Sequence, residues 1–333
     1  MRRATDVLYT PLCALLGIDV PILQAGMGMI ARAPLAAAVC EAGGLGMIGA
    51  AHLSAAELRD EIRAVKARTA RPFGVDVLFA QAEPSDDPTS LRYADEVRAQ
   101  LEVVLEEQVP VLVAGLGSPA GVVREAHTRG MKVLAMVGTA RQARRVVAAG
   151  VDAVIAQGHE AGGHTGRIGS MVLLPAVVDA VEVPVVAAGG FADGRGLVAA
   201  LALGAGGVWM GTRFVASREA TAHEAYKRRI TEVDEDSTVV SRAHSGKPCR
   251  LLRNAFTAYW QEHEAEIRPF PVQFLEVGRA ASVRARLEGD VDHGSAPAGQ
   301  SSGLIREVKG AGEIVRDVVA EARQVLARLG CSA

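Results

Sequence analysis

Aromatic side chains are scarce in this sequence, where they make up 4% of 333 residues. So low a share disfavours an all-β sandwich and any platform on which nucleic-acid bases would stack. An excess of one charge is also lacking, because 36 Lys and Arg residues face 38 Asp and Glu residues, which leaves a formal net charge of −2. Since there is no long basic block either, nucleic acid is not an expected partner.

Cysteine and long apolar runs are equally sparse. The chain holds four cysteines, and no two of them have C-x-x-C spacing: Cys13, Cys40, Cys249 and Cys331. We therefore expect no metal site and no disulfide framework, and a cytoplasmic location fits. No apolar run is long enough to cross a bilayer, and Asp6 and Pro11 interrupt the N-terminal one, so neither a membrane span nor a signal peptide is predicted. Thr10 and Pro11 instead predict a short helix that ends at Gly17.

What the chain does have is a regular succession of short apolar runs with helical patterns between them. There are eight such runs: residues 21–26, 45–50, 73–79, 109–115, 132–138, 152–158, 183–190 and 206–212. The runs are continuous rather than alternating, as expected for parallel strands that are covered on both faces. The succession predicts an α/β fold, a (β/α)₈ TIM barrel.

Three segments follow from the change in composition along the chain. The barrel is expected over residues 1–216. From residue 217 to 292 charged residues become more frequent and the strand runs stop, which predicts a smaller, mainly helical insertion that covers the substrate site. Residues 293–333 contain a Gly/Ser/Pro-rich stretch and a closing helix, which we expect to return to the barrel.

The stretch "AQGHEAGGHTGRIGS" (156–170) leaves a predicted buried strand through five glycines and two histidines. So much glycine indicates backbone that passes close to a ligand. His164 lies at the end of a barrel strand, where barrel chemistry occurs, and an imidazole can act as a base near neutral pH. His159 either lines the pocket or anchors the loop. A metal-binding pair is not expected, because the loop lacks a helix to align both rings and no third ligand is evident.

Two further glycine turns end the seventh and eighth predicted strands: "AAGGFADGRG" (187–196) and "MGTRF" (210–214). The loops after these strands commonly bind phosphate in barrels, although ordinary glycine turns are the alternative. "GMGMIA" (26–31) also matches a dinucleotide fingerprint, but no acidic residue ends the next strand. A tight loop against a flat ligand is therefore the favoured interpretation of that motif.

Together, "PILQAGMGMIARAPLAAAVCEAGGLGMIG", "GHEAGGHTG", "VPVVAAGGFADGRGLVAALALGAGGVWMGTRF" and "AGQSSGLI" closely resemble the nitronate monooxygenase family, formerly called 2-nitropropane dioxygenases. Flavin-dependent enoyl-ACP reductases and NADH:quinone reductases belong to the same superfamily. The resemblance covers about residues 18–325 and implies a TIM barrel with non-covalent FMN and an insertion over its mouth.

The resemblance also implies roles for individual residues. His164 would be catalytic, and His159 and Gln300 would lie near the substrate. The residues expected to bind FMN are Ala25, Gly26, Met27, Asp76, Gln157, Gly163, Gly189, Gly190, Gly211 and Thr212, of which Gly189, Gly190, Gly211 and Thr212 would hold the phosphate.

The chain departs from the family pattern at two positions. Many relatives carry Asn where this chain has Asp76, and an ionised carboxylate could accept a hydrogen bond from the flavin but could not donate one. Some relatives place a Lys after the fifth strand, where this chain reads "AMVGTA". Both departures bear on which activity the chain performs.

Three reactions fit one scaffold, because fold and cofactor site are shared and function lies in a few pocket residues. We favour FMN-dependent oxidation of alkyl nitronates by O₂ to a carbonyl compound and nitrite. The alternatives are NAD(P)H-dependent reduction of an enoyl thioester or of a quinone, and a non-catalytic flavin-binding protein. A small-molecule substrate is expected, while NAD(P)H use and a homodimer stay open. His52 either touches ligand or is solvated, and the five histidines expected in solvent are His127, His223, His244, His263 and His293.

Overall fold

The computed structural model describes residues 6–79 and 88–330, and Cys331 lies outside them. Its central sheet has eight parallel strands in the order β1-β9-β8-β6-β5-β4-β3-β2. They are β1 (Ile22–Gln24), β2 (Met47–Gly49), β3 (Gly74–Phe79), β4 (Val111–Gly117), β5 (Lys132–Val137), β6 (Ala153–Gln157), β8 (Val185–Ala188) and β9 (Gly207–Met210). A parallel bridge between Leu23 and Leu45 joins the two end strands. The sheet is therefore a nearly closed barrel, and the predicted (β/α)₈ fold is confirmed.

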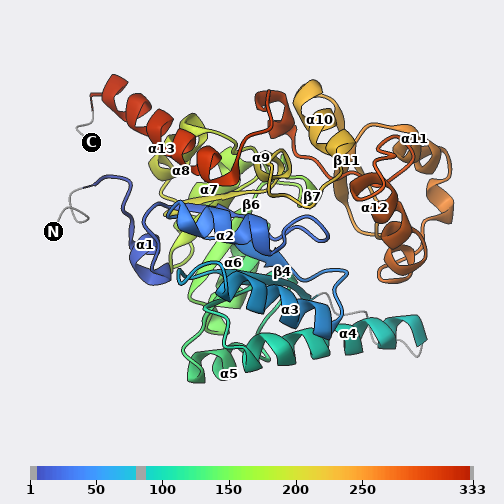
Figure 1. Ribbon diagram of the computed structural model, residues 1–333, viewed down its shortest axis with the longest axis horizontal. Helices are drawn as coiled ribbons and strands as arrows, with labels where there is room; N and C mark the ends of the chain where they lie inside the picture. The colour runs from blue at the N-terminus through green and yellow to red at the C-terminus, as the bar shows by residue number, and fades with distance from the viewer. Residues whose placement is uncertain (1–5, 80–87, 331–333) are drawn as a thin grey trace.

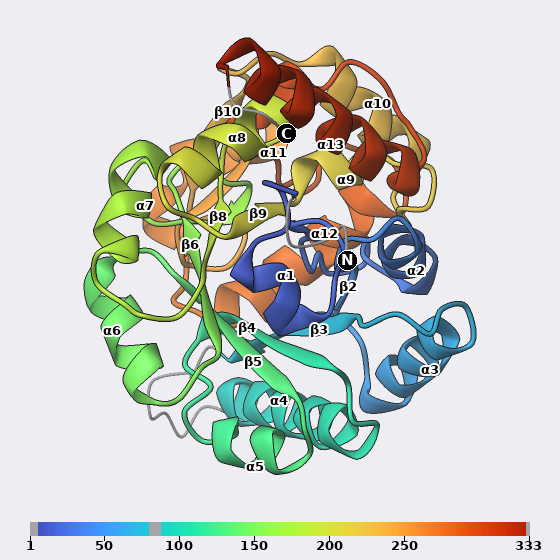
Figure 2. The ribbon, with the colours of Figure 1, turned by 90° about the vertical axis from the view of Figure 1, so that its left-hand side faces the viewer.

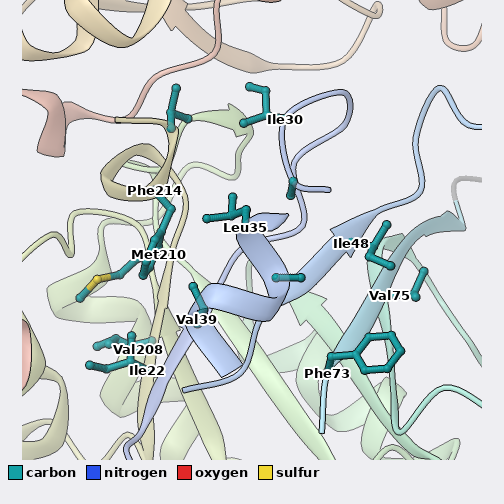
Figure 3. Close-up of a cluster of buried hydrophobic side chains, with 14 of the residues drawn as sticks. Ile22, Ile30, Leu35, Val39, Ile48, Phe73, Val75, Val208, Met210 and Phe214 are labelled. Atoms are coloured by element: carbon teal, nitrogen blue, oxygen red, sulfur yellow. The ribbon is translucent and has the colours of Figure 1, made fainter. Parts of the chain in front are cut away.

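The continuous apolar runs exist because both faces of each strand are buried. Along β1, Ile22 belongs to the layer between sheet and helices, and Leu23 belongs to the barrel interior. Along β9, Val208 likewise belongs to the layer between sheet and helices, and Trp209 belongs to the barrel interior. Figure 3 shows the outer layer, with Leu35 and Val39 of a covering helix beside the strand residues.

Helices surround the sheet, as the view along the barrel in Figure 2 shows. They are α2 (Ala33–Glu41), α3 (Ala55–Lys66), α4 (Pro88–Glu106), α5 (Val123–Thr128), α6 (Ala140–Ala148), α7 (Ser170–Val178) and α8 (Gly194–Ala202). A long C-terminal helix, α13 (Ala311–Arg328), packs against both α8 and α2 and completes the ring. The eighth barrel helix is thus supplied by the last segment of the chain.

A short helix closes the end of the barrel that faces the viewer in Figure 2. This is α1 (Pro11–Leu16), which Pro11 opens and Gly17 ends in a left-handed conformation with φ 69°. Leu12 and Leu16 belong to the interior cluster. Thr10 occupies the N-cap position, but its hydroxyl donates to the carbonyl of Gly206 instead of capping the helix. The helix seals the amino-terminal end of the strands.

The segment between β9 and α13 forms a lid over the opposite end of the strands, on the right in Figure 1. It contains α9 (Thr212–Val215), α10 (Glu224–Glu232), β10 (Thr238–Ser241), β11 (Cys249–Leu252), α11 (Ala255–Glu262) and α12 (Arg279–Arg286). β10, β11 and the two-residue β7 (Gly163–His164) make a three-stranded sheet. The sequence did not predict the two lid strands, because each is only four residues long and charged residues flank them.

Within the described residues, no helix combines the length and the hydropathy that crossing a bilayer requires.

Candidate active site

A cavity lies between the carboxyl ends of the barrel strands and the lid. Each of the eight strands, or the loop that follows it, contributes to the wall, from Ala25 after β1 to Thr212 after β9. The lid supplies the other wall, including His244, Phe274 and Arg286. In TIM barrels this face carries the chemistry.

The structure brings together His164 and all ten residues expected to bind cofactor. These are Ala25, Gly26, Met27, Asp76, Gln157, Gly163, Gly189, Gly190, Gly211 and Thr212. They come from the ends of β1, β3, β6, β8 and β9 and from the glycine-rich loop after β6. Residues that are up to about 190 positions apart in sequence thus line one wall.

The turn after β8 is shaped for a ligand that approaches the backbone. Gly189 and Gly190 have φ angles of +91° and +85°, which residues other than glycine rarely adopt. A Cβ atom on Gly189 would lie 2.9 Å from the carbonyl oxygen of Gly158. In the neighbouring turn, the Thr212 hydroxyl accepts a hydrogen bond from the Gly299 amide at 2.9 Å, so its own proton remains available to donate. Adjacent turns of this kind suit a phosphate.

Asp76 on β3 points into the cavity from a wall of glycine. Cβ atoms on Gly26 and Gly115 would lie 2.2 Å from Asp76 Cβ and 2.3 Å from its Oδ1, so only glycine leaves room for the carboxyl group. Asp76 is 7% exposed, and its Oδ1 has no hydrogen-bond partner. Burial raises the pKa of Asp76 well above its usual value, although a backbone hydrogen bond from Gly115 acts in the other direction. Burial therefore favours the protonated form of this carboxyl group, and one of its oxygens has no partner.

His164 is held by the lid as well as by the barrel. Its short strand, β7, pairs antiparallel with β11, where His164 lies opposite Cys249. Its Nε2 lies 2.7 Å from the hydroxyl oxygen of Ser245, and its carbonyl accepts a hydrogen bond from Gln157. Burial, with the positive charges of Lys247 and Arg286, lowers the pKa of His164 to about 4. At neutral pH the ring is uncharged and can accept a proton.

The two residues expected near the substrate lie outside the cavity wall. The Nδ1 of His159 is 2.8 Å from the carbonyl of Gly166, and the His159 carbonyl accepts hydrogen bonds from Arg250. His159 therefore anchors the glycine-rich loop, which was the alternative interpretation. The backbone N–H of Gln300 donates to the backbone carbonyl of Glu160, and the next residue, Ser301, lines the cavity instead.

Several cavity residues could not be identified from sequence. His244 was expected in solvent, and this prediction is wrong: the residue is 5% exposed and its ring lies 5.8 Å from that of His164. Ser295 contacts its Nδ1 at 2.9 Å. Arg286 and Phe274 also belong to the charged insertion, where spacing gave no signal of a site. They reach the barrel because the folded lid packs over the carboxyl ends of the strands.

His52, for which the sequence left two interpretations, lines the cavity. It has a strained backbone with φ 74°, and its Nδ1 is buried without a hydrogen-bond partner. Burial, followed by the nearby arginines, lowers its pKa to about 3. His52 therefore faces the cavity as a neutral ring.

No metal centre is formed within residues 6–79 and 88–330, where no three His, Cys, Asp or Glu side chains gather in a suitable group. Cys13, Cys40 and Cys249 are buried free thiols. The cavity's chemistry rests on histidine, one carboxyl group, arginine and glycine turns.

Comparisons with known proteins agree with this geometry. The family model for nitronate monooxygenase matches residues 9–321. The structure of FabK from Thermotoga maritima has 42% sequence identity and a TM-score of 0.87, with 96% of this chain and 98% of that one covered. A nitronate monooxygenase of Paraburkholderia phytofirmans is 35% identical, with 96% of each chain covered.

A relative from Mycobacterium tuberculosis is 42% identical over 249 residues, which are 74% of this chain and 66% of that protein. It is named (3aS,4S,5R,7aS)-5-hydroxy-7a-methyl-1-oxo-octahydro-1H-indene-4-carboxyl-CoA dehydrogenase. All these proteins are similar to this chain, and the family model covers nearly all of it. The chain belongs to the nitronate monooxygenase family and is an oxidoreductase.

Proposed function

We propose that this protein oxidises alkyl nitronates with O₂ to a carbonyl compound and nitrite, and that it does so with bound FMN. The observation that carries the proposal is the uncharged His164, which faces a cavity enclosed by glycine turns. Among the residues that the structure describes, Asp76 is the only acidic side chain in the cavity wall, and burial raises its pKa, which favours its uncharged form.

The residues present fit FMN. The turns at Gly190 and Thr212 offer a phosphate backbone amides and a free hydroxyl proton. The Oδ1 of Asp76 has no partner on the protein and is available to form a hydrogen bond with the flavin ring. Because Gly26 has no side chain, the Asp76 carboxyl group has room beside it. When bound, FMN supplies the two-electron chemistry that links the substrate to O₂.

The chain's own residues would accept the proton next to the nitro group and keep water out of the cavity. A neutral His164 that carries its hydrogen on Nε2 donates it to Ser245, which leaves the Nδ1 lone pair free to take the proton next to a nitro group. The Ser245 hydroxyl also accepts from the Lys247 amide at 3.4 Å, which fixes its lone pairs. Phe274 and the buried lid residues exclude water from the same space.

His164→Ala tests the proposal. FMN should stay bound with a nearly native spectrum, and turnover of a neutral nitroalkane should fall by about 10² to 10⁴, the usual contribution of a general base. Turnover of the pre-formed nitronate, which has already lost the proton, should fall less. Nitrite release and O₂ uptake are the measurements. Equal losses on both forms would make His164 an anchor for the anion, and no nitrite from the unmodified protein would refute the function.

A second candidate is redox chemistry on an acyl thioester. A groove continues the cavity past Gln157 and His164 and runs outward to Arg145 and Lys247. Its cations suit a substrate with a phosphate-bearing arm. The Mycobacterium tuberculosis relative is named for a CoA substrate. Anaerobic mixing of the FMN-loaded protein with an enoyl-CoA plus NADH or NADPH, followed by flavin absorbance, distinguishes this reaction from nitronate oxidation.

A further inference from the structure

Arg286 is a charged side chain buried in the cavity wall. It ends α12, and it is 6% exposed. Its carbonyl accepts a hydrogen bond from the His223 amide, so the backbone at this position is fixed. One guanidinium nitrogen, Nη1, donates to the carbonyl of Gly28 at 3.1 Å, and Nε is buried with no partner. A group with five N–H donors thus uses few of them on the protein.

No carboxylate neutralises this cation among the residues that the structure describes. The groups whose charge acts on Arg286 are Tyr226 and Cys249. Burial raises the pKa of Tyr226, and that of Cys249 to about 12, so both are neutral near pH 7. A buried charge without a partner is unfavourable, and proteins normally pair it.

Arg279, seven positions earlier on the same helix, shows the ordinary solution. Its guanidinium forms an ion pair with Glu96 at 2.9 Å and lies 5.7 Å from the centre of the Phe274 ring. Arg279 does not line the cavity. The two arginines therefore differ in their counter-charge. Arg279 is paired with a carboxylate, whereas Arg286 lines the cavity without one.

The charge of Arg286 reaches the substrate side of the cavity. It is among the causes that lower the pKa of His52, His164 and His244. Its neighbours Gly28 and Tyr226 belong to the loop after β1 and to the lid. The glycine turns suited to phosphate follow β8 and β9 instead. The cation thus lies within reach of the histidines that would act on substrate.

We propose that Arg286 binds the negatively charged oxygens of the substrate and that this anion completes the ion pair which the chain leaves open. The inference rests on the proposed function for the identity of the anion, a nitronate. A neutral nitroalkane would leave the guanidinium unpaired, so the site favours the anionic form. As proton removal by His164 creates negative charge on the nitro group, Arg286 stabilises that charge.

The test uses the FMN-loaded protein with Arg286→Met, Arg286→Lys and the control Arg279→Met. Nitrite serves as an unreactive anion, and its binding is followed by the change in absorbance of oxidised flavin. We expect the Kd for nitrite and the KM for propane-2-nitronate to rise about 10- to 100-fold in Arg286→Met, as a lost charge-assisted hydrogen bond predicts. Arg286→Lys should recover part of the loss, and Arg279→Met should change both values less than about threefold.

Two further measurements separate the sources of the anion. FMN and riboflavin differ in the phosphate, so their affinities are compared in each variant. A loss of FMN affinity in Arg286→Met with unchanged riboflavin affinity would assign Arg286 to the phosphate and overturn the proposal. Unchanged nitrite binding would overturn it as well. The nitrite measurement needs no turnover: if nitrite binding depends on Arg286 but no nitronate is oxidised, the proposed function fails while the anion site stands.

The apoprotein provides a check against a purely structural role. Because Arg286→Met removes an unpaired buried charge, its apo form should melt at a higher temperature than the unmodified apo form. A lower melting temperature, together with unchanged nitrite binding in Arg286→Met, would show that Arg286 serves the fold alone and would overturn the proposal.

Discussion

His52, His164 and His244 all face the cavity, and burial is the first cause of the lowered pKa in each of them. Asp76 shows the same effect with the opposite sign, since burial raises the pKa of a carboxyl group. The three histidines are therefore uncharged near pH 7, and burial favours the uncharged form of Asp76. At the residue scale, the described part of the cavity wall combines neutral imidazoles and a buried carboxyl group with one positive charge, that of Arg286.

The protonation state of His164 predicts an unusual pH profile. Its pKa is lowered to about 4, so the ring stays a base through mildly acidic solution. We expect kcat/KM for a neutral nitroalkane to stay level from about pH 8 to about pH 5 and to fall only as His164 takes up a proton below that. Circular dichroism across the same range controls for unfolding. An acid limb centred near the ordinary histidine value of about 6.5 would contradict the buried environment.

Asp76 predicts a stability effect that can be measured without turnover. Its pKa is raised in the folded protein, so the unfolded chain releases this proton first, and stability is lost as pH rises above the unfolded value. The loss amounts to about 1.4 kcal/mol per pH unit until the folded pKa is reached. Asp76→Asn keeps the shape and cannot ionise.

We therefore expect the Asp76→Asn apoprotein to melt at a higher temperature than the unmodified apoprotein at pH 7 to 8, with the difference shrinking toward about pH 4. The amide also offers the flavin a donor and an acceptor, so FMN affinity should be retained. Thermal melts of both proteins at several pH values provide the measurement. Parallel pH dependences for the two proteins would show that Asp76 is ionised in the fold.

At the scale of elements, the turns after β8 and β9 place different demands on the chain. Gly190 has φ +85°, where a side chain is strained, although a Cβ there would meet only Glu160 at 3.7 Å. Gly211 has an ordinary φ of −102°, and its Cβ would contact Ala25 at 3.5 Å. The first turn needs glycine for its conformation, and the second has room for a methyl group.

Gly190→Val should therefore lower the free energy of unfolding by about 1–3 kcal/mol and weaken FMN binding at least about tenfold. Gly211→Ala is the matched control for the fold and should unfold within about 0.5 kcal/mol of the unmodified protein. Urea unfolding of the apo forms and fluorescence titration with FMN give the two quantities. Unchanged FMN affinity in a folded Gly190→Val variant would place the phosphate elsewhere.

The elements that the sequence predicted are those whose pattern is local. Strands such as β3 and β6 are continuous apolar runs, and α1 has its proline and glycine at the expected ends. β10 and β11 carry no such pattern, and β7 exists only because β11 pairs with it. His244 and Arg286 were missed for the same reason: the folded lid, rather than their spacing, brings them to His164.

The whole molecule is organised around a cavity that the barrel and the lid build jointly. α13 passes back from the lid to α8 and α2, and the lid sheet includes the strand of His164. Arg286 of the lid donates to Gly28 of the barrel. Barrel and lid are therefore joined at both ends of the insertion and across the cavity, which predicts that they unfold together.

This arrangement predicts how cofactor removal acts on stability. A ligand that contacts both walls and binds only the folded state stabilises it by RT ln(1 + [L]/Kd), about 2.7 kcal/mol at a hundredfold excess over Kd. For a chain of 333 residues this corresponds to a rise in melting temperature of about 4 °C. Riboflavin, which lacks the phosphate, should raise it less if the turns at Gly190 and Thr212 hold that group.

Calorimetry of the apoprotein with each ligand, and with FAD, measures the effect. A single transition that shifts with FMN is the expected result. Two transitions, of which FMN shifts only one, would mean that the lid folds independently and that the cavity is not a shared site.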